Sequence, residues 1–234
     1  MLLSALALFA GCGKLGGPQA DGGRTANELV RDIVGLSEAP RIEFSDFYGR
    51  LLDEGRRWAG DKLRIGRISV GPAGAAGRQR GAAPVWLATV VRCDREEESG
   101  GVDKNSPPIK LCSGEARQAV MSNLNIDGYV IGFELGKEES FFGSAAKPEQ
   151  IKIAATEAQR LADASIGGKV AGAGQYIYEL TVRREDGVPV WRVVRDCQAG
   201  KTADGQCPGS GSWTVMINAE SGEVLSREPA EPRD

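Results

Sequence analysis

The feature that most constrains this chain is a short motif that it carries twice. Each copy reads Pro-Val-Trp, then a run rich in β-branched residues, then a cysteine, at 84–93 and at 189–197. A second cysteine follows in each copy, and Met121 and Met216 lie at the same distance beyond it. This agreement in register predicts one structural unit that is present twice. Two copies are too few for a solenoid, which indicates tandem domains or one pseudo-symmetric domain.

A pattern typical of a helix precedes each Pro-Val-Trp. In the second copy, Thr156 and Gln159 fit a capping box that opens an apolar stripe of helical spacing. In the first copy, Ser45 or Asp46 fits an N-cap before a similar stripe. We therefore expect one helix at the start of each copy.

Strand patterns follow each helix. In the second copy, 176–182 alternates apolar and polar residues, a turn is expected at Asp186-Gly187, and the chain returns through 190–194 and 213–217. The sequence therefore predicts the α+β fold class, as two tandem repeats of a helix packed on a small antiparallel β-meander.

The second copy resembles the PepSY domain and its PepSY-like relatives. The resemblance is carried by EAQRLADASIG, QYIYELTVRREDGVPVWRVV and WTVMINAESGEVLSRE, between Ile151 and Glu228. From Ile42 to Leu135 it rests mostly on the repeat. The family includes protease propeptides and exported regulatory or binding modules, and it brings no conserved catalytic residues. One function that the resemblance implies is an inhibitor or regulator of an exported protease.

A short apolar run precedes Cys12. The run, Leu2 to Ala10, is too short to cross a bilayer, and the stretch that ends Ala10-Gly11-Cys12 resembles the bacterial lipobox. In that motif, cleavage leaves the cysteine as a lipidated N-terminus. The segment 13–27 is rich in glycine and polar residues, as a flexible tether should be. Cys12 is therefore predicted to carry lipid such as palmitate, and the alternative is a plain cleaved signal peptide.

The expected location is the cell envelope, with the membrane as a partner through lipidated Cys12. Because Gly13 rather than Asp follows Cys12, the resemblance to lipoproteins favours the outer membrane, facing the periplasm, in a Gram-negative cell. In other cells the outer face of the cell membrane is expected. The predicted organisation is a signal peptide at 1–11, a lipid-tether linker at 12–27, a short helix and linker at 28–40, a PepSY-like repeat at 41–136, a linker at 137–149, a second repeat at 150–229 and a tail at 230–234.

Four cysteines remain if Cys12 takes lipid. In an oxidising compartment, four cysteines allow three pairings. The repeat selects Cys93 with Cys112 and Cys197 with Cys207, because each pair then ties the ends of the second and third strands of its own copy. The alternative is four buried free thiols.

The chain contains no histidine. This excludes Ser-His-Asp and Cys-His catalysis and His-ligated zinc. The net charge of −3 and the pI of about 5.3 give no basic stripe for nucleic acid. We therefore expect a non-catalytic binding or structural module without a cofactor, whose partner is an envelope protein or a protease. An enzyme that uses carboxylates is a further alternative.

The segment 123–134 follows the calcium-loop pattern. Asn123, Asn125 and Asp127 would supply oxygen ligands at positions one, three and five, and Glu134 would supply position twelve. Asparagine at position one lacks the charge that calcium favours, and the flanks are typical of strands rather than helices. A β-turn is therefore predicted here, and a calcium-binding envelope protein is the second alternative function.

Several other residues could contact a partner. Trp86, Trp191 and Trp213 are expected to pack in the core, although stacking on sugars or peptides is an alternative. Phe141 and Phe142, between the copies, could dock a partner or cover the seam between the copies. The acidic stretch 94–103 is interpreted as a solvated loop inside the first disulfide ring, and it is the main asymmetry between the copies.

Overall fold

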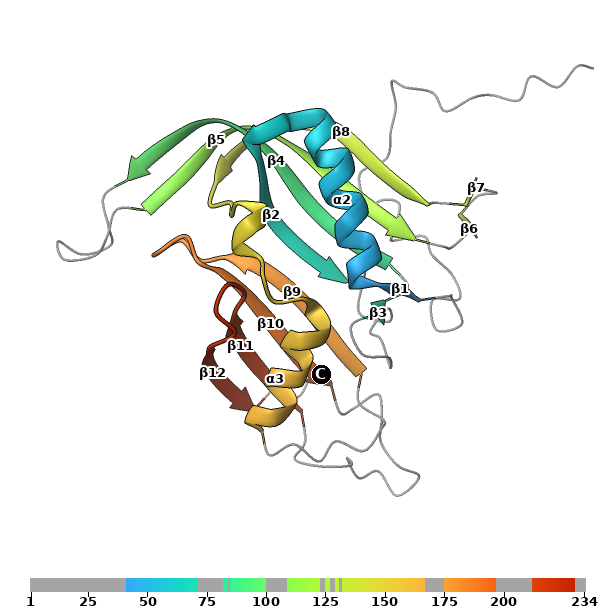
Figure 1. Ribbon diagram of the computed structural model, residues 1–234, viewed down its shortest axis with the longest axis vertical. Helices are drawn as coiled ribbons and strands as arrows, with labels where there is room; N and C mark the ends of the chain where they lie inside the picture. Colours follow the sequence, from blue (N-terminus) through green and yellow to red (C-terminus); the bar gives the residue numbers. More distant parts are fainter. Residues whose placement is uncertain are drawn as a thin grey trace, which may run out of the picture.

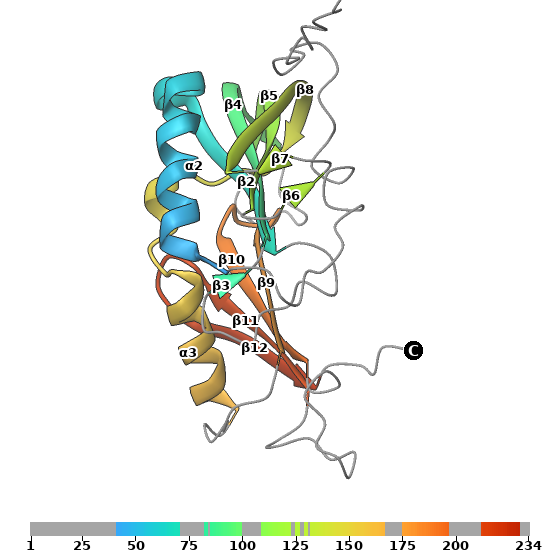
Figure 2. The same ribbon diagram turned by 90° about the vertical axis from the view of Figure 1, so that its right-hand side faces the viewer.

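The two strand-rich regions build one antiparallel sheet, and both helices cover the same face of it (Figures 1 and 2). The computed structural model describes residues 41–70, 82–83, 85–99, 109–122, 125–126, 129–130, 132–166, 175–196 and 212–229. In chain order, the elements are β1 (Ile42–Glu43), α2 (Phe44–Ala59), the 3₁₀ turn η1 (Gly60–Lys62), β2 (Leu63–Val70), β3 (Ala82–Ala83), β4 (Val85–Ser99), β5 (Ile109–Ser122), β6 (Asn125–Ile126), β7 (Tyr129–Val130), β8 (Phe133–Gly143), the 3₁₀ turn η2 (Pro148–Gln150), α3 (Ala155–Ser165), β9 (Gln175–Val182), β10 (Pro189–Asp196), β11 (Trp213–Asn218) and β12 (Val224–Pro229).

The sheet has eight strands in the order β12-β11-β10-β9-β2-β4-β5-β8. The first half, 41–143, supplies α2 and the run β2-β4-β5-β8. The second half, 148–229, supplies α3 and the run β9-β10-β11-β12. Every neighbouring pair is antiparallel. The fold is therefore α+β with one antiparallel sheet, which agrees with the predicted fold class.

The two halves meet at the β2–β9 pair. Only three residue pairs form this junction: Arg67 with Thr181, Ile68 with Leu180, and Ser69 with Glu179. Ile68 and Leu180 point toward the helices and are fully buried. On the other face, the Glu179 carboxylate lies 2.6 Å from Arg67 of β2 and 3.6 Å from Arg192 of β10. One carboxylate thus links three neighbouring strands.

A single hydrophobic core lies between the sheet and the helices and includes residues of both halves. Phe44, the first residue of α2, makes edge contacts with Trp86 of β4 and Trp191 of β10, both with ring centroids 5.3 Å apart. Phe47 lies one turn further along α2 and stacks on Trp86. The aromatic side chains therefore bring the two halves together beneath the helices.

Each of these two tryptophans also binds the segment that enters the helix of its own half. Trp86 Nε1 donates to the carbonyl of Ile42 at 2.8 Å, and Trp191 Nε1 donates to the carbonyl of Ile153 at 2.7 Å. Both side chains are fully buried, which confirms the predicted core role of Trp86 and Trp191. Trp213 is half-buried on β11.

The helices begin two or three residues earlier than the capping patterns predict. The N-cap residues are Glu43 for α2 and Ala154 for α3, and neither makes a side-chain capping hydrogen bond. Thr156 therefore lies in the first turn of α3 and is not its N-cap. The start of α3 is fixed by tertiary contacts instead, because the amides of Lys152 and Ile153 both donate to the carbonyl of Ala219 at 2.9 Å.

Part of the expected linker at 137–149 is a strand instead. Residues up to Gly143 belong to β8, which pairs with β5 along the edge of the sheet. The chain then crosses to β2, where Ile65 and Ala146 exchange two backbone hydrogen bonds of 2.8 and 2.9 Å. The charged residues of this stretch suggest a linker in sequence, but charged side chains are common on an edge strand.

Several sequence predictions lie outside the described residues. They are the signal peptide, the tether and short helix before residue 41, Cys12, Cys197, Cys207 and the C-terminal tail. Within the part of the chain that the structure describes, neither helix has the length and apolar character required to cross a membrane.

The two tryptophan hydrogen bonds give a stability prediction. Trp86→Phe and Trp191→Phe should each lower the free energy of unfolding by about 2–3 kcal/mol, because each leaves a buried carbonyl without its donor and a gap in the core. Urea unfolding of the purified protein measures this. The control is Trp58→Phe, since Trp58 is only half-buried and its Nε1 bonds an exposed carboxylate. Equal losses in all three variants would contradict the assigned roles.

Candidate functional site

A cleft opens where the pairing between the two halves ends. Arg67 and Thr181 are the last pair of the junction. On the N-terminal side of Arg67, Ile65 of β2 pairs with Ala146 instead, and on the C-terminal side of Thr181, β9 continues into the turn that leads to β10. In that turn, Arg183 exchanges backbone hydrogen bonds with Gly187 and Val188. The strands of the two halves therefore separate, and the crossing segment 144–150 lies between them.

A disulfide forms one wall of the cleft. Cys93 of β4 and Cys112 of β5 are joined, which confirms this predicted pair. Val91 and both cysteines form a second small core with Ala116, on which Phe141 and Ala145 pack. Val90 belongs to the main core instead, so alternation along β4 places the disulfide on the sheet face away from the helices.

The disulfide lies beside an irregularity of the β4–β5 ladder. The register shifts between Cys93 and Arg95, so that Asp94 has no partner in β5. Gly114 faces Cys93 here, and a Cβ on Gly114 would lie only 2.0 Å from the carbonyl oxygen of Arg92. This close backbone approach requires glycine. After the bulge the hairpin continues to Ser99, so 94–99 is a strand and not the expected loop.

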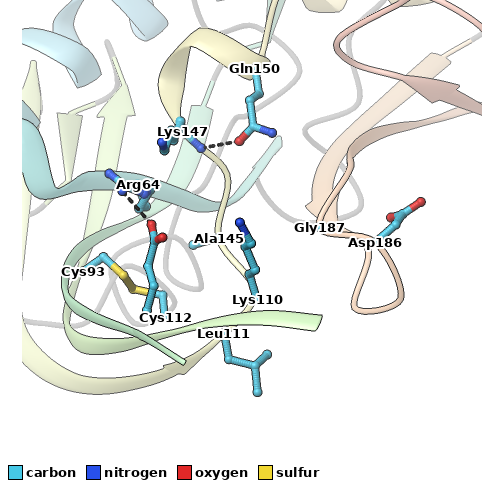
Figure 3. A pocket seen from close by; sticks show the side chains of 11 residues that line it. Arg64, Cys93, Lys110, Leu111, Cys112, Ala145, Lys147, Gln150, Asp186 and Gly187 are labelled. Carbon is cyan, nitrogen blue, oxygen red and sulfur yellow. Dashed lines mark hydrogen bonds and ion pairs between the residues drawn. A yellow bond between two sulfur atoms is a disulfide. The ribbon is translucent and has the colours of Figure 1, made fainter. Parts of the chain in front are cut away.

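The cleft has a volume of about 590 Å³. Figure 3 shows that its lining comes from the β4–β5 hairpin, from the crossing segment and from the β9–β10 turn of the second half. Its lining residues are Arg64, Cys93, Glu96, Lys110, Leu111, Cys112, Ala145, Lys147, Gln150, Asp186 and Gly187. This volume is in the range of natural ligand pockets.

Arg64 and Glu96 form a fixed ion pair at the base of the cleft. Arg64 Nη2 lies 2.8 Å from Glu96 Oε1, and Arg64 Nη1 donates to the carbonyls of Asp61 and Leu63 at 3.2 and 3.0 Å. The hydrogen bond from Arg64, helped by the charges of Lys147 and Lys110, lowers the pKa of Glu96. Glu96 is therefore ionised at neutral pH and neutralises Arg64.

On the opposite wall of the cleft, the Asp186 carboxylate is hydrogen-bonded within its own turn. The Asp186 carboxylate accepts hydrogen bonds from the amide of Val188 at 3.0 Å and from Arg183 Nε at 3.2 Å. Gly187 has a φ of +69°, the left-handed conformation that this turn requires. The turn predicted at Asp186-Gly187 is present, and it presents a neutralised carboxylate to the cleft.

A second charged cluster lies on the helix side of the first half, around Trp58 of α2. The Cζ atoms of Arg117 and Arg92 lie 5.0 and 5.7 Å from the centre of the Trp58 ring. Trp58 Nε1 and Arg117 Nη2 both donate to Glu138 Oε1 at 2.7 Å. These bonds, the one from Arg117 first, lower the pKa of Glu138 to about 2. This cluster attaches the end of α2 to β4, β5 and β8.

The second half contains a buried polar network that the sequence did not reveal. Tyr178 of β9 donates to Gln159 Oε1 of α3 at 2.5 Å, and Tyr176 donates to Asp163 Oδ1 at 2.9 Å. Burial, followed by the hydrogen bond to Asp163, raises the pKa of Tyr176 to about 12. The network attaches α3 to β9, and its only sequence signal is tyrosine on the helix-facing positions of the strand.

Two of the four predicted calcium ligands, Asn125 and Glu134, lie in strands. Asn125 is in β6, which pairs with β7, and exposed Glu134 is in β8 opposite Val120 of β5. Asn123 and Asp127 lie outside the described residues. A calcium loop needs helices on both sides, so the context does not fit this motif. Within the residues that the structure describes, no group of three or more acidic or cysteine side chains could hold a metal ion.

The adjacent Phe141 and Phe142 of β8 differ in environment. Phe141 packs on the small core around the disulfide, and Phe142 is 64% exposed. Of this pair, Phe142 is therefore the one that a partner could contact.

Each aspartate or glutamate of the described residues whose pKa is clearly shifted has it lowered: Asp94, Glu96, Glu138 and Glu157. In each case a hydrogen bond from Lys or Arg is the first cause. These groups stay ionised at neutral pH, whereas a carboxylic general acid needs a raised pKa.

No family model, no curated protein and no solved structure matches this chain.

The disulfide gives the first site prediction. Peptide mapping without reduction should find Cys93 joined to Cys112. Replacing both by serine should lower the free energy of unfolding by about 3 kcal/mol, as expected for a loop of this length. Urea unfolding measures the loss, and the double variant leaves the other cysteines untouched. A crosslink from Cys93 or Cys112 to Cys197 or Cys207 would contradict the structure.

The Trp58 cluster gives a pH prediction. Because the pKa of Glu138 is lowered from 4.5 to about 2, its contribution to stability is present above pH 4.5 and is lost as the pH falls toward 2. Glu138→Gln should therefore lower Tm at pH 7, and the difference from wild type should shrink steadily between pH 4.5 and 2. Thermal unfolding by circular dichroism measures it, with exposed Glu139→Gln as control. A difference independent of pH would refute the ion-pair role.

Proposed function

We propose that this chain is a lipid-anchored protein of the cell envelope that acts as a non-catalytic binding or structural module. The observation that carries the proposal is the cleft whose wall is the Cys93–Cys112 disulfide. Structural disulfides persist mainly in oxidising compartments outside the cytoplasm, which supports export. A concave site bounded by such a crosslink and by two different halves of the molecule suits recognition of a partner.

The charge state of the carboxylates supports a non-catalytic role. Glu96 in the cleft is ionised and held by Arg64, and Asp186 is held by its own turn. Without histidine in the chain, proton transfer would fall to groups of this kind. Both are occupied by ion pairs and hydrogen bonds that position the cleft walls.

We further propose that the chain is a tandem duplication of a PepSY-like unit. Three features support it. Each half runs from a helix into four antiparallel strands in sequential order. The tryptophan of each Pro-Val-Trp lies on the second of these strands, beneath the helix. Trp86 and Trp191 bind equivalent carbonyls just before α2 and α3.

The PepSY-like resemblance supports a second candidate function, that of an inhibitor or regulator of an exported protease. The cleft favours it because it is open to a chain segment between the two halves. Copurification of peptidase activity with the anchored protein, and a change of that activity on adding pure protein, would separate this function from a purely structural one.

The anchor itself is directly testable. Cells grown with an alkyne-tagged palmitate should label the full-length protein, and the label should disappear in Cys12→Ser. Cys207→Ser is the matched control and should stay labelled. The wild-type protein should sediment with membranes and resist salt extraction, because a lipid anchor is held by apolar burial. Label that survives in Cys12→Ser, or release of the wild type by salt, would refute the anchor.

A further inference from the structure

We propose that the cleft binds an acidic peptide segment, with a peptide carboxylate on Lys110 and Lys147 and a neighbouring apolar side chain against the disulfide. This inference deepens the proposed binding function and rests on it. It names the chemistry of the ligand, which neither the fold nor the resemblance supplies.

The charge balance of the cleft is the first argument. Three cationic side chains line it, Arg64, Lys110 and Lys147, against the carboxylates of Glu96 and Asp186. Arg64 neutralises Glu96, and Arg183 neutralises Asp186 from the same turn. Within the described residues, Lys110 and Lys147 form no ion pair. These two ammonium groups are therefore open to a carboxylate from a ligand.

The positions of these two lysines are the second argument. Figure 3 shows Lys110 extending from β5 toward the segment that carries Ala145, and Lys147 lies beside Arg64 at the other end of that segment. The charges of both lysines also contribute, after the hydrogen bond from Arg64, to the lowered pKa of Glu96 in the same lining. Glu98 faces Lys110 across the ladder but does not line the cleft. Both lysines line the same cleft, so a ligand carboxylate bound there can interact with their charges.

The apolar part of the lining is the third argument. Half-buried Ala145 and the exposed edge of the Cys93–Cys112 disulfide, whose cysteines are 6% and 4% exposed, form a small apolar patch in the cleft. A small inorganic anion would leave this patch in contact with water. A peptide that carries an apolar residue next to its carboxylate would cover the patch and pair the charges together.

The walls of the cleft are fixed before a ligand arrives. The disulfide holds β4 to β5, the two Ile65–Ala146 hydrogen bonds hold the crossing segment, and the Asp186 hydrogen bonds hold the far turn. A preformed site loses little conformational entropy on binding. Measurable affinity for a short peptide is therefore expected.

Fluorescence polarisation with full-length protein in detergent micelles tests the proposal. Three labelled peptides are compared: Asp-Leu-Asp-Leu amide, Asn-Leu-Asn-Leu with a free C-terminal carboxylate, and Asn-Leu-Asn-Leu amide. At least one carboxylate-bearing peptide should bind about tenfold or more tightly than the neutral amide, and binding should weaken with added salt. The better of the two shows whether the carboxylate comes from a side chain or from a chain end. Equal binding of all three peptides would overturn the proposal.

Variants then locate the site. Lys110→Gln and Lys147→Gln should each weaken binding of the acidic peptide about tenfold, and the double variant should weaken it further. Both lysines are exposed, so these variants should fold, which an unchanged Tm verifies. Lys137→Gln is the matched control, because Lys137 is exposed on β8 and does not line the cleft. An equal loss in Lys137→Gln would show a general charge effect and overturn the site.

The outcomes separate this inference from the proposed function. If palmitate labelling at Cys12 succeeds and the peptides fail to bind, the anchored module stands and the ligand assignment is wrong. If the peptides bind at the lysines and labelling fails, the cleft stands and the envelope anchor is wrong.

Discussion

The short pairing of β2 with β9 is the interaction on which the rest of the architecture depends. It involves three residue pairs, yet it turns two four-stranded runs into one sheet. The few backbone hydrogen bonds of this junction could not hold the two halves together by themselves, since each contributes about 1 kcal/mol net. The junction is stabilised by what lies above it: Ile68 and Leu180 in the core, and Phe44 against the tryptophans of both halves. Pairing and core reinforce each other.

The cleft is a geometric consequence of this junction. Strands twist relative to their neighbours, so two long strands that pair over a short distance diverge beyond it. The chain fills part of the divergence with Ala146, which satisfies the backbone of Ile65, and leaves the remainder open. The side chains around this opening come from segments far apart in sequence. Lys110 of the first half and Asp186 of the second therefore line one cleft only because the halves share one sheet.

The features that sequence analysis predicted correctly are those with a local or repeated pattern. The burial of Trp86 and Trp191 and the Cys93–Cys112 pair follow from the repeat. The features it missed depend on tertiary contacts. The strand character of 94–99 comes from pairing with β5, although its residues are mostly charged. The start of α3 is set by hydrogen bonds to Ala219 rather than by Thr156. The cleft could not be predicted, because no pattern along the chain encodes the β2–β9 junction.

The difference between the halves explains why one of them would carry the recognition site. The β4–β5 ladder continues past a bulge to Ser99, and Gly114 permits the close backbone approach that this bulge needs. Within the residues that the structure describes, the corresponding β10–β11 ladder pairs as far as Arg195 and Trp213. The extension brings Glu96 and Lys110 beyond the edge of the main core, where the sheet no longer needs apolar side chains on both faces. If the two units arose by the proposed duplication, the extended β4–β5 hairpin of the first unit adds charged residues to one wall of the cleft without changing the shared core. The β9–β10 turn of the second unit forms the wall that faces it.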